Sequence, residues 1–145
     1  MIKFFFLAEF EYSNGDETER FDLGIFTSKS KAEEKINVIK NKPGFNNYDQ
    51  SFFKIIKFGV NFDRNEVNKE KATLFSVWVE YPDEKNLFYY VIFDYFSSYQ
   101  KAKAKVDFLK NHSRIGKKHP EKLKISKINI NDFSSWLGGF EKYSF

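Results

Sequence analysis

The sequence contains no cysteine, so it has neither a disulfide framework nor thiolate chemistry. No apolar run approaches the length of about 18 residues that crosses a bilayer. The glycine pairs form no phosphate-binding loop, no serine lies in a Gly-x-Ser-x-Gly motif, and there are only two histidines. These absences remove the common signatures of redox, membrane-spanning, nucleotide-binding and serine-hydrolase proteins. We therefore expect a cytoplasmic protein that uses no cofactor and no metal and is not an enzyme.

The chain has 145 residues, which is enough for one well-buried core, whereas two halves of about 70 residues would each be marginal alone. A single domain spanning residues 1–145 is the expectation. Phenylalanine, with 19 copies, and tyrosine, with eight, are many for one core of this size. Either the codon bias of an AT-rich genome or an aromatic surface for a partner explains this excess.

The chain repeats itself at an offset of 70 residues. Residues 53–61, FKIIKFGVN, return as residues 123–131, LKISKININ, with four of nine positions identical. A period of this length indicates one supersecondary unit used twice. The predicted organisation is a first repeat at 1–62, a linker at 63–72, a second repeat at 73–131 and an aromatic tail at 132–145.

The first repeat predicts the order β-β-α-β. Residues 3–12 alternate, with Phe4, Phe6, Ala8, Phe10 and Tyr12 on one face, which is typical of a strand. An Asn-Gly turn at 13–16 leads to a second strand at about 19–27. A helix then opens at Thr27-Ser28, buries Ala32, Ile36 and Ile39, and ends at Lys42-Pro43-Gly44. A third strand follows at about 52–62.

The second repeat predicts the same order. Strands are expected at about 73–81 and 87–96, with a turn at 82–86. The helix is expected to start at Ser97 with the capping box Ser97-x-x-Gln100 and to bury Ala102, Val106 and Leu109. A basic loop at 112–120 and a strand at about 122–131 follow. In both third strands the apolar pairs change phase, which indicates either a β-bulge near Lys57 and Lys127 or strands buried on both faces.

Together these patterns predict an α+β fold. Two β-β-α-β repeats would form about six mainly antiparallel strands with two helices on one face, related by a pseudo-two-fold axis. The two halves differ in charge, because residues 1–70 carry a net −1 and residues 71–145 a net +5. This difference is expected if one half gained a partner-facing role, and drift alone would also produce it.

The first repeat resembles a small bacterial domain family of unknown function. The residues that carry the resemblance are Phe10-Glu11-Tyr12, Asp16-Glu17-Thr18, Leu23-Gly24-Ile25-Phe26-Thr27-Ser28, Lys31-Ala32-Glu33-Glu34-Lys35-Ile36 and Pro43-Gly44-Phe45. The family ends in a Trp-x-Glu-Gly-Phe tail, and Trp136-Leu137-Gly138-Gly139-Phe140 is similar to that tail. The chain departs from the family pattern at Glu9, where the family usually has histidine. The resemblance implies the fold and no known active site.

One candidate partner-binding surface is acidic and another is aromatic. The acidic residues surround the first hairpin and are Glu9, Glu11, Asp16, Glu17, Glu19 and Asp22. They suit a cationic protein surface, whereas the plainer interpretation is a solvated hairpin whose charged edges discourage aggregation. The tail supplies Trp136, Phe140, Tyr143 and Phe145, which either dock on their own domain or form an interface.

The second repeat offers a basic candidate. Its cations are Lys101, Lys103, Lys105, Lys110, Arg114, Lys117, Lys118, Lys122, Lys124 and Lys127. With Tyr99, Phe108 and Trp136 nearby they suit nucleic acid or an acidic protein, and otherwise they form a solvated face. The chain has only three arginines, which argues against base-specific reading. His112 and His119 flank the basic loop without carboxylate or cysteine neighbours and make a poor metal site.

The leading hypothesis is a non-enzymatic protein-binding inhibitor that acts by occlusion. Its partner would be a toxin or a defence nuclease, so the protein would be a toxin-immunity protein or a phage-encoded inhibitor of host defence. Shape, charge complementarity and a few aromatic residues suffice for such a role. The alternative is nucleic-acid binding through Lys101, Lys105, Arg114, Lys117, Lys118 and Lys122. Exposed sheet edges also allow a homodimer, and no membrane partner is expected.

Overall fold

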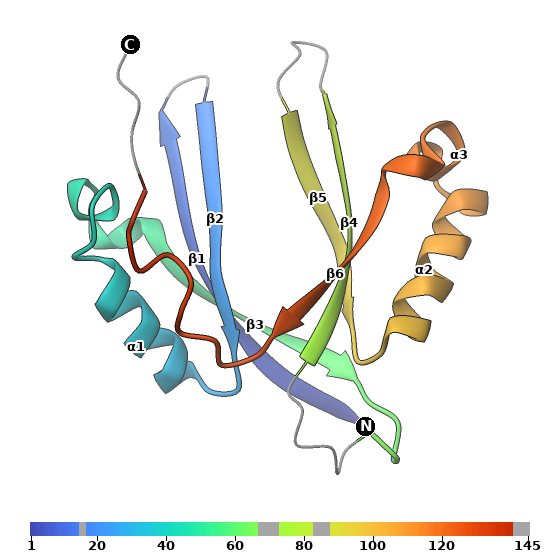
Figure 1. Cartoon of the computed structure of the whole chain (residues 1–145), viewed down its shortest axis with the longest axis horizontal. Coiled ribbons are helices and arrows are strands. Elements are labelled where there is room, and N and C mark those ends of the chain that lie inside the picture. The colour runs from blue at the N-terminus through green and yellow to red at the C-terminus, as the bar shows by residue number, and fades with distance from the viewer. Residues whose placement is uncertain (15–16, 67–72, 83–87, 141–145) are drawn as a thin grey trace. The chain divides into compact units, whose positions relative to one another are not determined.

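The computed structural model describes residues 1–14, 17–66, 73–82 and 88–140 (Figure 1). The strands and helices follow the predicted order: β1 (Ile2–Asn14), β2 (Glu17–Phe26), α1 (Lys29–Ile39), β3 (Phe53–Asn61), β4 (Thr73–Pro82), β5 (Phe88–Phe96), α2 (Tyr99–His112), α3 (Arg114–Lys118) and β6 (Leu123–Asn129). Short 3-10 turns are η1 (Phe45–Asn47), η2 (Gln50–Phe52) and η3 (Pro120–Lys122). The predicted turn residues 15–16 and 83–86, and the tail residues Tyr143 and Phe145, lie outside the described residues.

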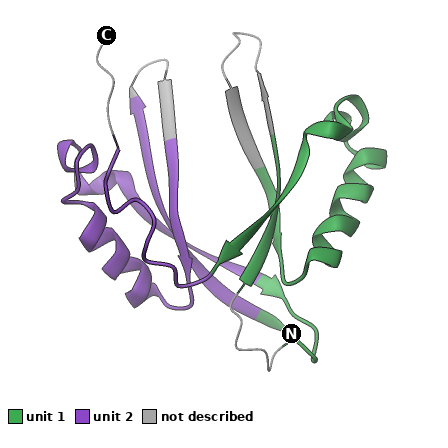
Figure 2. Cartoon of the chain, viewed as in Figure 1, with its two compact units in different colours: residues 1–2, 60–129 green, residues 3–59, 130–145 purple. Residues whose placement is uncertain are grey.

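The α+β class with six antiparallel strands is confirmed. The strands form two three-stranded sheets, in the orders β2-β1-β3 and β5-β4-β6, and each sheet has its own helix. The chain divides into two compact units: unit 1 contains residues 1–2 and 60–129, and unit 2 contains residues 3–59 and 130–145 (Figure 2). The pseudo-two-fold relation between the repeats stays a prediction. No helix in the described ranges is long and apolar enough to cross a membrane.

Helices α1 and α2 each begin after a serine whose side chain caps the first turn. The side chains of Ser28 and Ser98 each accept a hydrogen bond from the backbone N–H three residues later, at 3.2 Å in both helices. The predicted start of the second helix at Ser97 is wrong by one residue, because Ser98 is the N-cap. The hydroxyl of Ser97 instead donates to the Glu66 carboxylate at 2.7 Å. The predicted stripe of α2, Ala102, Val106 and Leu109, is buried.

Each first–second strand pair contains one β-bulge at the equivalent place. The register shifts after Ala8 in β1 and after Val77 in β4. The residues left without a pairing partner are Leu23 in β2 and Phe93 in β5, which are 70 positions apart. Both side chains turn into the hydrophobic cluster of their own unit, so the bulge directs an extra apolar residue inward.

The structure decides between the two interpretations of the last strand and corrects the basic loop. The bulge near Lys127 does not occur, because β6 pairs with β4 in an unbroken register from Leu123 to Asn129. The alternative holds there: Leu123 and Ile125 pack with the α2 cluster, and Ile128, three positions on, takes the opposite face. The bulge near Lys57 stays a prediction. The basic stretch 112–120 is not simply a loop, since it contains α3.

The core of unit 2 is built around Phe10. This residue is fully buried in β1, and its ring lies 5.2 Å from that of Phe45 and 5.1 Å from that of Phe53. Edge-to-face contacts of this kind add to the free energy of area burial. Ala32 and Ile39 of α1 close the cluster on the helix side. Unit 1 has the smaller equivalent, in which Val77 and Val79 pack against α2.

Substitution of Phe10 by alanine should destabilise the protein by about 3–5 kcal/mol, because it removes a fully buried ring and leaves a cavity. Phe4 lies on the same strand but is 55% exposed, so Phe4→Ala should change stability by no more than about 0.5 kcal/mol. Urea unfolding followed by far-UV circular dichroism measures both. Equal effects of the two substitutions would contradict this account of the core.

Candidate functional site

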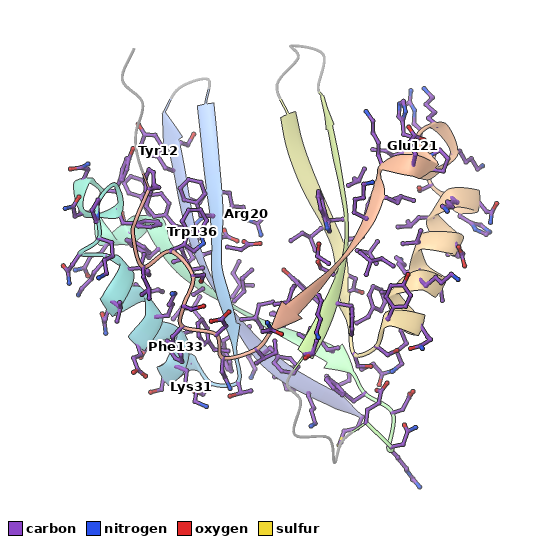
Figure 3. All side chains as sticks on the ribbon, in the orientation of Figure 1. Tyr12, Arg20, Lys31, Glu121, Phe133 and Trp136 are labelled. Carbon is purple, nitrogen blue, oxygen red and sulfur yellow. The ribbon has the colours of Figure 1, made fainter. Side chains whose placement is uncertain are left out.

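The first hairpin carries a patch of mixed charge on the sheet face away from α1. In the β1–β2 register Glu9 lies opposite Asp22, and Glu11 lies opposite Arg20, so all four share one face. Figure 3 shows Arg20 on the side of the hairpin away from α1. The Arg20 guanidinium lies 2.8 Å from Glu9 Oε2 and 3.6 Å from Asp22 Oδ1. Lys54 of β3 lies 3.8 Å from Glu11. We call these five residues the charged patch.

Burial perturbs two carboxylates of the charged patch. Removal from water raises the pKa of Glu9 above its usual value; Arg20 opposes the rise, and Asp22 and Glu11 add to it. Burial also raises the pKa of Asp22, again against the effect of Arg20. The ion pairs with Arg20 offset part of the cost of burying these two carboxylates.

The structure brings three members of the predicted acidic surface, Glu9, Glu11 and Asp22, together in the charged patch. Glu9 is only 2% exposed, so it is a buried ion-pair partner and not the surface residue that the sequence predicts. Asp16 lies outside the described residues. Glu17 and Glu19 belong to β2, but the described part of the chain does not include their side chains. Sequence reasoning missed Arg20, although its position two residues before Asp22 on an alternating strand places both on one face.

Trp136 and Phe140 dock on their own unit, as the first of the two tail interpretations predicts. The Trp136 ring stacks on Phe21 with centroids 4.8 Å apart, and its indole N–H donates to the carbonyl of Asp22 at 3.1 Å. Phe140 packs edge-on against Phe45 at 4.7 Å. In Figure 3 Trp136 and Phe133 lie on the side of the β1–β2 hairpin where α1 lies. We call residues 130–140 the C-terminal strap.

A buried lysine that the sequence did not single out holds the strap. Lys35 of α1 has no exposed surface, and its ammonium donates to the carbonyl of Phe133 at 2.9 Å and to that of Ser135. Burial lowers the pKa of Lys35, while the nearby Asp132 carboxylate raises it. The signal in the sequence is weak, because a lysine between Ala32 and Ile39 on a helical stripe usually extends to solvent.

The second candidate surface is formed by α2 and α3. Nine lysines or arginines and only two acidic residues lie between positions 99 and 124. The exposed members of this α2–α3 surface are Tyr99, Lys103, Phe108, Lys110, His112, Arg114, Lys117 and Lys118, with Lys105 half-buried among them. Tyr99 and Phe108 are each 51% exposed, which is high for large aromatic side chains.

The ring of Phe108 is held in place by its neighbours on the helix. His112, one turn later, stacks on it with centroids 4.2 Å apart and planes 8° apart. The Lys105 ammonium, one turn earlier, lies 5.4 Å from the ring centroid. These contacts engage the π-system of Phe108, although the side chain stays 51% exposed.

The residues predicted for nucleic-acid binding are only partly brought together. Arg114, Lys117 and Lys118 are exposed on α3 and its start. Lys101 instead holds the segment after β3: its ammonium lies 3.2 Å from Asp63, 3.3 Å from Glu66 and 3.1 Å from the carbonyl of Asn61. Its charge is thus already paired. Lys122 is half-buried in η3.

A metal site needs several His, Asp or Glu side chains that converge on one point. No group of three or more His, Asp or Glu side chains among those residues is placed to hold a metal ion. His112 lies against Phe108, and His119 lies 3.7 Å from Glu121. A cavity of about 240 Å³ at the start of α2 is lined by Phe62, Glu66, Phe75, Ser97 and Lys127 among others. It is smaller than typical small-molecule sites.

The raised pKa of Glu9 predicts a pH dependence of stability. Between the usual value of 4.5 and the raised value, the native state binds more protons than the unfolded state. The free energy of unfolding therefore falls as pH rises through that window and stays lower above it. Glu9→Gln should remove this loss, by roughly 1.4 kcal/mol for each unit of the shift. Urea unfolding from pH 4 to pH 8 measures it.

Glu34→Gln is the control for this prediction, because Glu34 is an exposed residue of α1 outside the charged patch. Its stability should parallel that of the wild type across the pH range. The stability of Glu9→Gln relative to the wild type should instead grow with pH. If the free energies of unfolding of all three proteins change in parallel with pH, burial does not raise the pKa of Glu9.

Comparisons of the chain with protein-family models, with curated proteins and with solved structures found no match. The resemblance of the first repeat to a family of uncharacterised bacterial domains thus stays a prediction.

Proposed function

We propose that the protein is a non-enzymatic binding protein that attaches to an acidic surface of a protein partner through the α2–α3 surface and acts by occlusion. An immunity protein of a bacterial toxin and a phage-encoded inhibitor of host defence both work in this way. Such a role needs a shaped, charged surface with a few buried aromatic residues, and no reacting group. The charged patch of unit 2 is less suited, because its central carboxylate is buried and paired with Arg20.

The observation that carries the proposal is how the two helices have diverged. Their inward positions keep their class: Ala32, Ile36 and Ile39 of α1 correspond, 70 residues on, to Ala102, Val106 and Leu109 of α2. Their outward positions do not: Glu33, Glu34 and Val38 correspond to Lys103, Ala104 and Phe108, all exposed. Asn37 corresponds to Asp107, so the net charge of the equivalent ranges 29–42 and 99–112 is the same, +3. What distinguishes the outward face of α2 is an exposed aromatic ring in place of valine and one acidic residue in place of two.

The arrangement of Phe108 favours a protein partner over nucleic acid. Single-stranded nucleic acid binds aromatic residues by stacking a base on an open ring face. The π-system of Phe108 is already engaged by His112 and Lys105, so the ring offers its edge, which suits insertion into an apolar pocket. The surrounding cations are mostly lysines, which attract a carboxylate surface without the bidentate geometry of base or phosphate recognition.

Phe108→Ala should weaken binding to the partner by at least about tenfold, because it removes the aromatic residue at the centre of the surface. Val38→Ala is the matched control: Val38 is the equivalent residue of α1, is 42% exposed, and should leave affinity within about twofold. The partner is identified by crosslinking and mass spectrometry from the source cell. Calorimetry with the purified partner then measures both variants.

Two results would overturn the proposal. One is recovery of the tagged protein with no stoichiometric protein partner. The other is recovery with nucleic acid that nuclease removes, with affinity that falls steeply with salt and drops on charge reversal at Lys117 and Lys118. The latter result would establish the nucleic-acid alternative instead.

A further inference from the structure

The segment that follows the third strand of each repeat belongs to the unit of the other repeat. The chain passes from unit 2 to unit 1 at residue 60, near the end of β3, and returns to unit 2 at residue 130, after β6 (Figure 2). These two positions are 70 apart, which is the offset of the sequence repeat. The exchange is therefore reciprocal and equivalent in the two repeats.

Within unit 2 most hydrogen bonds to the strap have a backbone group on at least one side. The side-chain oxygen Oδ1 of Asn131 accepts hydrogen bonds from the backbone N–H of Thr27 at 3.0 Å and from the Thr27 hydroxyl at 3.3 Å. The backbone N–H of Asn131 donates to the carbonyl of Ile25 at 2.9 Å. The hydroxyl of Ser135 donates to the carbonyl of Leu23 at 2.9 Å. The strap thus runs along β2, and its side chains Phe133, Trp136 and Phe140 complete the unit 2 cluster.

Two glycines allow the end of the strap to approach the loop after α1. Gly44 and Gly139 both have positive φ, 85° and 74°. A Cβ at Gly139 would lie 2.0 Å from the carbonyl oxygen of Pro43, and one at Gly44 would lie 2.2 Å from that of Phe140. The N–H of Phe140 donates to that same Pro43 carbonyl at 2.9 Å. The two backbones therefore meet in a fit that only glycine permits.

Unit 1 receives the equivalent segment from the first repeat. The ammonium of Lys101, in the second repeat, lies 3.1 Å from the carbonyl of Asn61 and 3.3 Å from the Glu66 carboxylate. The Phe62 N–H donates to the carbonyl of Met1, which is a contact within the first repeat. Ser97, the equivalent of Thr27, donates to the Glu66 carboxylate. The same site at the start of each helix is thus used to bind the incoming segment, although the residues that bind it differ.

We propose that each repeat recognises the segment after the third strand of another repeat as a ligand, so that its partner is a second β-β-α-β repeat. The fused chain is in effect a two-repeat complex with a covalent connection. A chain with one repeat of this type would complete its fold by exchanging segments with a second copy, which is the logic of domain-swapped dimers. The covalent connection between the repeats supplies effective concentration, and its first residues, Asp63 to Glu66, are part of the bound segment.

The test is to cut the folded protein between the repeats. A protease recognition sequence inserted between Asn68 and Lys69 allows cleavage of the full-length chain after purification. The expected result is that residues 1–68 and 69–145 remain one species on size-exclusion chromatography at about 1 μM, with unchanged circular dichroism. Elution of two separate, folded monomers would overturn the proposal.

Two neighbouring glycines provide a matched pair of variants. Gly139→Ala places a Cβ against Pro43, whereas Gly138→Ala meets nothing within 4 Å. In the cut protein Gly139→Ala should raise the dissociation constant of the fragments at least tenfold over Gly138→Ala. In the intact protein the tether compensates, so both variants should stay folded. Equal dissociation constants for the two cut variants would show that the strap is not the recognised element.

If Gly139→Ala unfolds the intact protein, Ser135→Ala replaces it. This substitution removes one hydrogen bond to the carbonyl of Leu23 and disturbs no ring contact. The expected weakening in the cut protein is about fivefold, the equivalent of one ordinary hydrogen bond. An unchanged dissociation constant for Ser135→Ala would count against the strap as ligand. This experiment is independent of the α2–α3 surface, so its outcome leaves the proposed function to be judged separately.

Discussion

The hydrogen bonds from the buried Lys35 ammonium to two strap carbonyls are the interaction on which unit 2 depends. Burying an ammonium is costly, and the lowered pKa of Lys35 reflects that cost. The carbonyls of Phe133 and Ser135 satisfy two of its three donors. The strap also brings Trp136 and Phe140 against Phe21 and Phe45, so the aromatic cluster of unit 2 includes residues more than 90 positions apart.

The equivalent position in the second repeat shows how the duplicated helix was reused. Lys105, 70 residues after Lys35, is half-buried and lies over the ring of Phe108. Lysine at this position thus binds two carbonyls in unit 2 and contacts an exposed aromatic ring in unit 1. Because the inward stripe of both helices is kept, this divergence leaves the packing of each helix on its sheet unchanged. A fold that holds each helix by a narrow stripe of apolar residues leaves the outward face free to change.

The element order was predictable from the sequence because it depends on local patterns. Alternation in residues 3–12 and the helical spacing of Ala102, Val106 and Leu109 are properties of short segments. Details that depend on distant partners were not predictable. Ser97 and Ser98 are both good N-caps, and Ser98 takes the role because the hydroxyl of Ser97 is used by Glu66, 31 residues away. The bulges lie at Leu23 and Phe93 because strand pairing, which one strand does not encode alone, sets the register.

The sequence by itself determined that one β-β-α-β unit occurs twice, because the periodicity of apolar residues follows from the geometry of strands and helices. Only the tertiary structure decided which residues are surface and which are core. Glu9 and Lys35 carry charges that a sequence reader places in water, yet both are buried because partners far along the chain or on the next strand satisfy them. Trp136 belongs to the core and Phe108 to the surface for the same reason: burial depends on what three-dimensional neighbours cover, and hydrophobicity alone does not specify those neighbours.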